Sequence, residues 1–352
     1  MSRSILLAAC LLAALAASPA RADFTDGLDA AQKGDYAAAL REWQPLASAG
    51  DATAQANLGI LYEQGLGVEK NLPLAVEWYE KAANAGNVES QFHLGLIFAL
   101  GQGVAKDPVK AFQWFEKAAI QGDARAEYNL GVLLADGTGR PADPMKAAEW
   151  FEKAARQDHA EAKYRYAVFI QSGLVKPSSP DLLGQYLLFA ANAGIADAQF
   201  RLGQLYLVGK APGTAGLEKN PVEAIRWLTA ASDQKHIPAT VELGLAYYQG
   251  GSVKQDFGKA LKFFLQAAEA GRPAAQFNLC LMYQKGQGVP QDYVQAHFWC
   301  NLATAGFSGG NERDMAIRLR DEIGEEMSGR SLEKAQTMAQ EWWAKRAISA
   351  PQ

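Results

Sequence analysis

The clearest catalytic candidate in this sequence is the pair Ser331 and Lys334, which has the spacing S-x-x-K. In penicillin-interacting enzymes that motif supplies a serine nucleophile, and it occurs together with S-D-N and K-T-G. Neither companion motif is present in this chain. Ser331 also follows a break in the helical pattern at residues 328–331, where serine is a favoured N-cap for a helix over 332–346. We therefore favour the capping role and keep a β-lactam-interacting hydrolase as an alternative.

No other residue set predicts catalysis, metal binding or a cofactor. The four histidines (His93, His159, His236 and His297) are not spaced as metal ligands, and neither H-E-x-x-H nor C-x-x-C occurs. A phosphate-binding G-x-x-x-x-G-K-[ST] loop and a dinucleotide fingerprint are also missing from the sequence. We expect no cofactor, no metal and no enzymatic activity.

A helical repeat must position all of these residues. A small residue recurs at steps of 36, 36, 36, 36, 41 and 36 residues, at Gly59, Gly95, Gly131, Ala167, Gly203, Gly244 and Cys280. An aromatic residue keeps the same phase, at Trp78, Trp114, Trp150, Tyr186, Trp227, Phe263 and Trp299. Such a period is the signature of a solenoid of stacked units. Because glycine costs about 1 kcal/mol inside a helix relative to alanine, we interpret it as a gap for large side chains on a second, antiparallel helix.

The repeated motifs point to a known family. The units share, with departures at single positions, the pattern A-x-A-Q-x-N-L-G-x-x-Y, then a G-x-G-V loop, then A-x-x-W-[YF]-x-K-A-A-x-x-G. This pattern resembles the Sel-one-like (Sel1-like) repeat, a longer-looped relative of the tetratricopeptide repeat. The resemblance covers residues 52–310 as seven units, of which the fourth is degenerate and the fifth has a longer loop at 210–220. It implies an all-α fold, a right-handed α-solenoid of helix-turn-helix repeats with a period of about 36 residues.

The segments on either side of the repeats are predicted to cover the two ends of the solenoid, as solenoids require. Residues 23–51 read as an N-terminal partial repeat, with a helix that includes Tyr36 and Trp43. Residues 311–352 read as C-terminal capping helices, whose Trp342 and Trp343 supply apolar bulk to dock on the last repeat.

Cys280 and Cys300 are a candidate disulfide. Cys280 occupies the small position of a first helix, and Cys300 follows Trp299 at the position of Tyr79 on the second helix. These two positions face one another in the helix pair, so the Cα atoms can come within the roughly 7 Å that a disulfide needs at the closest crossing. The alternative is a pair of small buried thiols.

The remaining signal is a row of polar side chains at one position in the first helix of each repeat. The position of Asn57 carries Asn57, His93, Asn129, Arg165, Arg201, Glu242 and Asn278, flanked by Phe92, Tyr128, Tyr164, Phe200 and Phe277. In tetratricopeptide-like solenoids this row lines the concave groove, where amides and basic groups hold peptide backbone or carboxylates. The resemblance therefore implies that a partner binds here. The partner-binding candidates are Asn57, His93, Tyr128, Asn129, Tyr164, Arg165, Phe200, Arg201, Phe277 and Asn278. The alternative is that these side chains only bond to neighbouring helices.

The first 22 residues read as a secretory signal, with Arg3, an apolar run from Ile5 to Ala17 and a small-x-small cleavage site at 20–22. A lipobox-like Leu7-Ala8-Ala9-Cys10 is the alternative, although few apolar residues precede Cys10. Removal of residues 1–22 takes the formal net charge from −4 to −6, which argues against a nucleic-acid partner. We expect a periplasmic or secreted protein with no membrane-spanning segment after cleavage.

Together these features predict an extracytoplasmic scaffold or adaptor that binds an unknown protein or peptide in its groove. The alternatives are a scaffold for glycan or peptidoglycan, which an aromatic-lined groove could also hold, and the hydrolase considered above.

Overall fold

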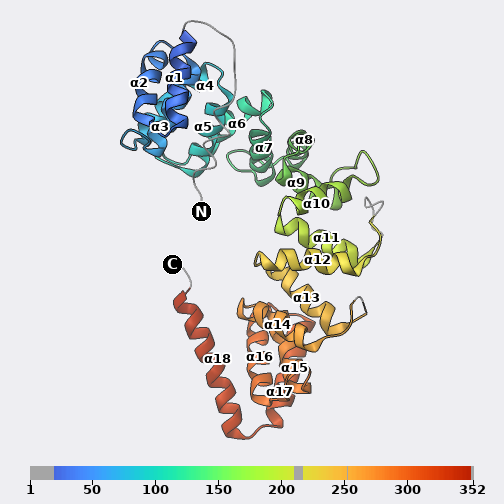
Figure 1. Ribbon diagram of the computed structural model, residues 1–352. Helices are drawn as coiled ribbons and strands as arrows, with labels where there is room; N and C mark the ends of the chain where they lie inside the picture. Colours follow the sequence, from blue (N-terminus) through green and yellow to red (C-terminus); the bar gives the residue numbers. More distant parts are fainter. Residues whose placement is uncertain (1–19, 210–216, 252, 350–352) are drawn as a thin grey trace. The chain divides into compact units, whose positions relative to one another are not determined.

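The computed structural model describes residues 20–209, 217–251 and 253–349, and the side chains of residues 24–346 within these ranges. Every regular element in these ranges is an α-helix (Figure 1). The helices are α1 (Ala20–Gln32), α2 (Tyr36–Ser48), α3 (Ala52–Gln64), α4 (Leu72–Asn84), α5 (Val88–Leu100), α6 (Pro108–Ile120), α7 (Ala124–Asp136), α8 (Pro144–Arg156), α9 (Ala160–Gln171), α10 (Leu182–Asn192), α11 (Ala196–Val208), α12 (Pro221–Asp233), α13 (Ile237–Gln249), α14 (Phe257–Glu269), α15 (Pro273–Lys285), α16 (Tyr293–Gly306), α17 (Asn311–Glu325) and α18 (Gly329–Ser349). The predicted all-α class is confirmed. The signal segment falls mostly on residues 1–19, which lie outside the described residues.

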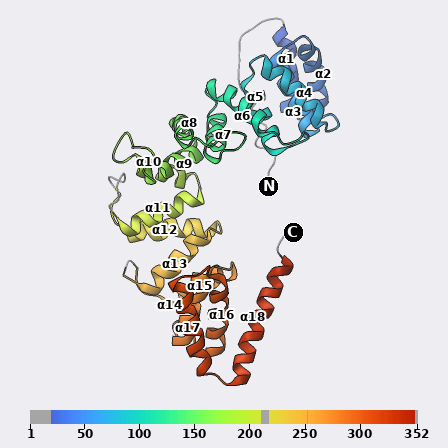
Figure 2. The same ribbon diagram turned by 180° about the vertical axis from the view of Figure 1, so that it is seen from behind.

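The helices form two compact units, residues 1–175 and 176–352, which are described separately. Within each unit consecutive helices pack as pairs, and the second helix of one pair packs on the first helix of the next (Figures 1 and 2). We call α3, α5, α7, α9, α11, α13 and α15 the first helices, and α4, α6, α8, α10, α12, α14 and α16 the second helices. This is the helix-pair repeat that the sequence predicts.

The loop glycines end the first helices and bring successive pairs together. Gly65 and Gly101 both cap their helices at φ 72°, in the left-handed region that favours glycine. The next loop glycine, Gly103, packs on the start of α4, where a Cβ atom would lie 2.3 Å from the Cβ of Leu72. A G-x-G loop therefore has two separate functions, to end one helix and to pack on the preceding repeat.

In four repeats the glycine inside the first helix (Gly59, Gly95, Gly131 and Gly244) faces an aromatic ring on the second helix, whereas Gly203 faces Leu228. A Cβ atom on Gly59 would lie 2.6 Å from the Tyr79 ring, and one on Gly131 would lie 2.7 Å from the ring of Phe151. Phe151 is 1% exposed. The ring that fills the gap is therefore not the repeated tryptophan but the residue after it. Trp150 stays half-buried, with the Lys153 ammonium 3.7 Å from its ring centre.

Cys280 and Cys300 occupy these same two positions in α15 and α16. The structure joins them in a disulfide, with a Cα–Cα distance of 5.2 Å. In the last repeat the disulfide therefore takes the place of the contact between glycine and an aromatic ring that other repeats have. It spans the same close approach between the two helices.

We expect this disulfide to be present in protein that is made in an oxidising compartment. Titration of free thiols in the denatured, unreduced protein should give close to zero reactive thiols from these residues, and about two after reduction. About two thiols before reduction would show that the cysteines pack as a reduced pair.

Both ends of the repeat array are covered by helices. At the start, the pair α1 and α2 buries Trp43, whose Nε1 donates to the Phe24 carbonyl oxygen at 3.2 Å. At the end, α17 and α18 pack on α16 and bury Ile323 and Ala339 with the core of the last repeat. Of the two adjacent tryptophans, only Trp342 packs against that core, because Trp343 lies on the outer side of α18 with 43% exposure.

The helix start predicted at Ser331 is wrong by one turn. Helix α18 begins at Gly329, and the Oγ of Ser328 accepts a hydrogen bond from the Ser331 backbone nitrogen at 3.2 Å. Ser328 is therefore the capping residue, because only its side chain reaches the free N–H groups of the first turn. The Ser331 hydroxyl lies 2.9 Å from the Ser328 hydroxyl.

Candidate functional site on the first helices

The first-helix face is the side of the first helices that carries the Asn57 position. The hydrogen bonding of Asn57 differs from that of the other two asparagines on this face. Asn57 is 8% exposed, and its amide has no hydrogen bond to a described residue. The amide nitrogens of Asn129 and Asn278 donate to backbone oxygens one turn earlier, at 2.7 and 2.8 Å. Their amide oxygens have no such partner among the described residues, so they can still accept hydrogen bonds.

Arg125 is the centre of a charged cluster on this face in the first unit. Its guanidinium donates to both oxygens of Glu89 (3.1 and 2.6 Å), across to the preceding first helix, and to Asp123 at 3.2 and 2.6 Å. The guanidinium also lies 4.2 Å from the centre of the Phe92 ring. Such bidentate pairs fix geometry as well as charge. Arg125 therefore joins α5 to α7.

His93, a predicted binding residue, belongs to the same cluster. Its ring stacks on Tyr79 with ring centres 5.2 Å apart, and its Nε2 lies 3.2 Å from Glu89. Tyr79 in turn donates to Glu63 at 2.7 Å. Burial by itself would raise the pKa of Glu89, but hydrogen bonds and charge from His93 and Arg125 lower it to about 2. The cluster thus holds an ionised carboxylate at every pH near neutrality.

We expect Glu89 to stabilise the fold in a pH-dependent way. Because its pKa falls from 4.5 to about 2 on folding, its contribution is fully present above about pH 4.5 and is lost as the pH falls towards 2. Glu89→Gln should therefore cost on the order of 1 kcal/mol at pH 7 and close to nothing at pH 2.5. Denaturant unfolding of both proteins across this range measures the difference. A difference that does not change with pH would contradict the assigned ion pair.

Two of the predicted aromatic residues pack against histidines of the following repeat, Tyr128 in a stacked and Phe200 in a tilted arrangement. Tyr128 lies 4.8 Å from the ring centre of His159, and Phe200 lies 4.8 Å from that of His236. Both histidines also cap the next first helix, where Nδ1 accepts from a backbone N–H at 3.3 and 3.2 Å. Burial lowers the pKa of His159, in keeping with that acceptor role. One face of each aromatic ring is therefore covered, so these rings join neighbouring repeats in addition to any contact with a partner.

The other candidates lie in different surroundings. Arg165 is exposed on α9 in the first unit, and Arg201 is half-buried on α11 in the second. Tyr164 is half-buried, and Phe277 packs against the core of the last repeats. Glu161 and Asp197, each four residues before one of these arginines, lie beside histidines: Glu161 is 3.4 Å from His159, and Asp197 is 3.2 Å from His236.

A buried glutamine at the start of the first helices was missed from the sequence. The side-chain amides of Gln55, Gln91 and Gln199 each donate at 3.0 Å to a carbonyl oxygen in the last turn of the helix just before their own. Each of these carbonyl oxygens also accepts a hydrogen bond at 3.1 Å from the backbone N–H three residues later, so the glutamine amide fills a second acceptor position on it. The repeated A-x-A-Q motif carried this signal, because a polar residue at a fixed buried position indicates a fixed bond.

The described helices offer neither a membrane span nor a metal site. None of them is long and apolar enough to cross a bilayer. Within the same ranges no group of three or more His, Cys, Asp or Glu residues could hold a metal ion.

With this geometry in place, comparison with known proteins identifies the repeat. The sequence model of the Sel1 repeat family matches residues 52–87, 88–123, 124–159, 196–236, 237–271 and 273–306. The chain belongs to the Sel1 repeat family. The matched ranges leave out 160–195, the degenerate fourth unit, where the structure has α9 and α10.

Relatives of this Sel1 repeat chain share parts of its length. It is 32% identical over 101 residues to chitin synthase regulatory factor 2 of Schizosaccharomyces pombe, covering 28% of this chain and 20% of that protein. It is 33% identical over 89 residues to the ERAD-associated E3 ubiquitin-protein ligase component HRD3A of Arabidopsis thaliana, covering 25% and 12%. The chain thus spans a fifth or less of these two relatives. A crystal structure of a Sel1 repeat protein from Oxalobacter formigenes matches with a TM-score of 0.58 and 29% identity, over 70% of this chain and 96% of that one.

Proposed function

We propose that this protein is an extracytoplasmic scaffold that binds a segment of a partner protein on its first-helix face and has no catalytic activity. Sel1 repeat proteins serve as protein-interaction scaffolds, and the HRD3A relative is a component of a larger ligase assembly. The secretory signal read from residues 1–22 supports the location.

The observation that carries the proposal is the state of the amides on the first-helix face. Asn57 has no hydrogen-bond partner among the described residues, and the oxygens of Asn129 and Asn278 are free to accept. Buried or half-buried amides normally find partners, because an unmade hydrogen bond costs about 1–3 kcal/mol. An extended peptide supplies both N–H and C=O groups at regular spacing, so it suits a repeated row of amides.

The arginines add a preference for acidic partners. Arg165 and Arg201 occupy equivalent positions in the fourth and fifth repeats. A guanidinium group binds carboxylates through two parallel hydrogen bonds. We therefore expect the bound segment to carry at least one carboxylate that Arg165 or Arg201 binds.

Replacement of Arg165 and Arg201 by glutamate tests this preference. We expect binding of the partner to fall at least tenfold while the melting temperature stays nearly unchanged. The measurement is quantitative mass spectrometry of the proteins that immobilised wild type and variant retain from an envelope extract. Partners of the first-helix face are those depleted by the variant.

The matched control is Arg41→Glu with Lys262→Glu. Both residues are exposed on α2 and α14, outside the first helices, and the change in net charge is the same. The control should retain the partners that wild type retains. If the two double variants behave alike, binding depends on overall charge or on another surface, and the first-helix face is not the binding site.

A further inference from the structure

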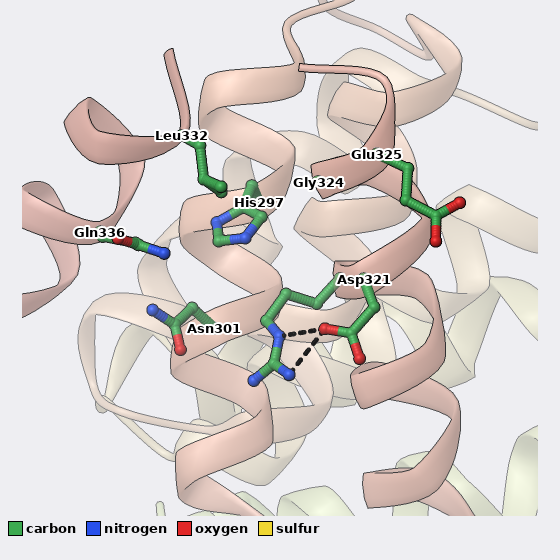
Figure 3. Close-up of a pocket in the computed structure, with 8 residues that line it drawn as sticks. His297, Asn301, Asp321, Gly324, Glu325, Leu332 and Gln336 are labelled. Carbon is green, nitrogen blue, oxygen red and sulfur yellow. Dashed lines mark hydrogen bonds and ion pairs between the residues drawn. The ribbon is translucent and has the colours of Figure 1, made fainter. Parts of the chain in front are cut away.

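A cavity separate from the first-helix face lies among the last three helices of the second unit. It has a volume of about 410 Å³ and opens between α16, α17 and α18. Its lining residues are His297, Asn301, Arg320, Asp321, Gly324, Glu325, Leu332 and Gln336. In Figure 3 the side chains of His297, Asn301 and Gln336 converge from α16 and α18, whereas Glu325 turns outward from α17. The volume is in the usual range of small-ligand pockets, roughly 300–1,000 Å³.

His297 forms the inner wall of this cavity and has no hydrogen bond to any described residue. The residue is 5% exposed, and its Nδ1 is fully enclosed without a partner. Burial lowers its pKa, and the nearby Arg320 lowers it further against the opposite effect of Asp321, so the ring is neutral. An enclosed N–H without an acceptor is rarer than an enclosed acceptor. We assign the proton to Nε2, so that the enclosed Nδ1 is an acceptor and Nε2 is a donor.

Other donors face the same space. The Nε and Nη2 atoms of Arg320 donate to Asp321 Oδ1 at 2.9 and 2.7 Å, and its Nη1 has no such bond to a described residue. The amides of Asn301 and Gln336 likewise have no partner among the described residues. A guanidinium arm, two amides and an imidazole N–H around one cavity suit a ligand with a negatively charged acceptor.

Gly324 leaves room on the α17 side of the cavity. A Cβ atom there would lie 3.8 Å from His297 and 3.9 Å from the nearest carbon of Leu332, which is ordinary contact without a clash. A larger side chain at this position would therefore fill the space beside the imidazole at little cost to folding.

We propose that this cavity binds the α-carboxylate of a free amino acid or of the C-terminal residue of a short peptide. His297, Asn301, Gln336 and Arg320 supply the donors. Arg320 and Asp321 neutralise one another, and Glu325 lies at the rim and turns outward, so it is placed to attract the ammonium group of a ligand that carries one. The site is independent of the partner surface proposed above, because it uses none of the first-helix residues.

Saturation-transfer NMR on the purified protein tests this assignment with three probes. The first is a pool of mixed-sequence tripeptides with free carboxylates, the second is the same pool amidated at the C-terminus, and the third is a pool of free amino acids. We expect a signal from at least one free-carboxylate pool, and at least tenfold weaker binding of the amidated pool. If only the tripeptides give a signal, the site binds peptide C-termini. If the amino acids give a signal as strong as that of the tripeptides, or stronger, the site binds free amino acids.

Two glycine variants separate this cavity from the rest of the surface. Gly324→Leu should weaken binding of the responding pool at least tenfold while circular dichroism and melting temperature stay close to wild type. Gly329→Leu is the matched control, since a Cβ atom there meets no atom within 4 Å and Gly329 does not line the cavity. The proposal is overturned if no free-carboxylate pool gives a signal at millimolar concentration, if amidation has no effect, or if Gly324→Leu binds as well as the control.

Discussion

Gly131→Leu should lower the free energy of unfolding by several kcal/mol, which corresponds to a fall in melting temperature on the order of 10 °C. A Cβ atom at this position would lie 2.7 Å from the ring of Phe151, which is 1% exposed and has no space to move into. Added methylenes in a packed core usually cost about 1–3 kcal/mol. The cost here should exceed that range, because the clash begins at the first carbon and the rest of the side chain adds to it.

A compensating pair tests the cause of this loss. The fourth repeat carries Ala167 and Leu187 at the two positions of Gly131 and Phe151. Gly131→Ala together with Phe151→Leu copies that pair, and it should be clearly more stable than Gly131→Ala alone. Thermal unfolding followed by circular dichroism measures all three variants. If Gly131→Leu melts within a degree or two of wild type, the close approach of α7 and α8 is not what requires glycine.

Removal of residues 311–352 should cause aggregation or a markedly lower melting temperature. The deletion takes away α17 and α18, and with them the cover over α16 that Ile323, Ala339 and Trp342 provide. The apolar face of the last repeat would then meet water, and uncapped solenoids lose solubility. Size-exclusion chromatography and thermal unfolding measure the two effects. A truncated protein that stays monomeric and equally stable would show that this segment is a tail.

Single alanine substitutions of Trp342 and Trp343 test the same docking of α18 in a full-length protein. Trp342 packs against the core of the last repeats, whereas Trp343 is 43% exposed. Trp342→Ala should cost about 2–4 kcal/mol, somewhat below the value for a fully buried tryptophan. Trp343→Ala should cost about 0.5 kcal/mol or less. Equal losses would mean that α18 does not dock through the face seen in the structure.

The sequence by itself determined the repeat, its helix pairs and the positions of its loops. These features depend on local chemistry that recurs every 36 residues: N-caps such as Asp51 and Asn87, and glycines such as Gly65 that end helices at positive φ. It also brought Cys280 and Cys300 to facing positions, because the repeat phase carries them to the places of Gly59 and Tyr79. Periodicity fixes which residues of a helix pair can meet.

Only the tertiary structure decided which side chains cover one another between repeats. The positions of Tyr128 and Phe200 in the sequence are the same whether their ring faces are open or covered, and the histidines that pack against them, His159 and His236, come from the next repeat. The cavity at His297 likewise depends on how α16, α17 and α18 pack, and two of these helices lie outside the repeat. Distances between side chains on different helices depend on the separation and rotation of those helices, which no spacing within one helix encodes.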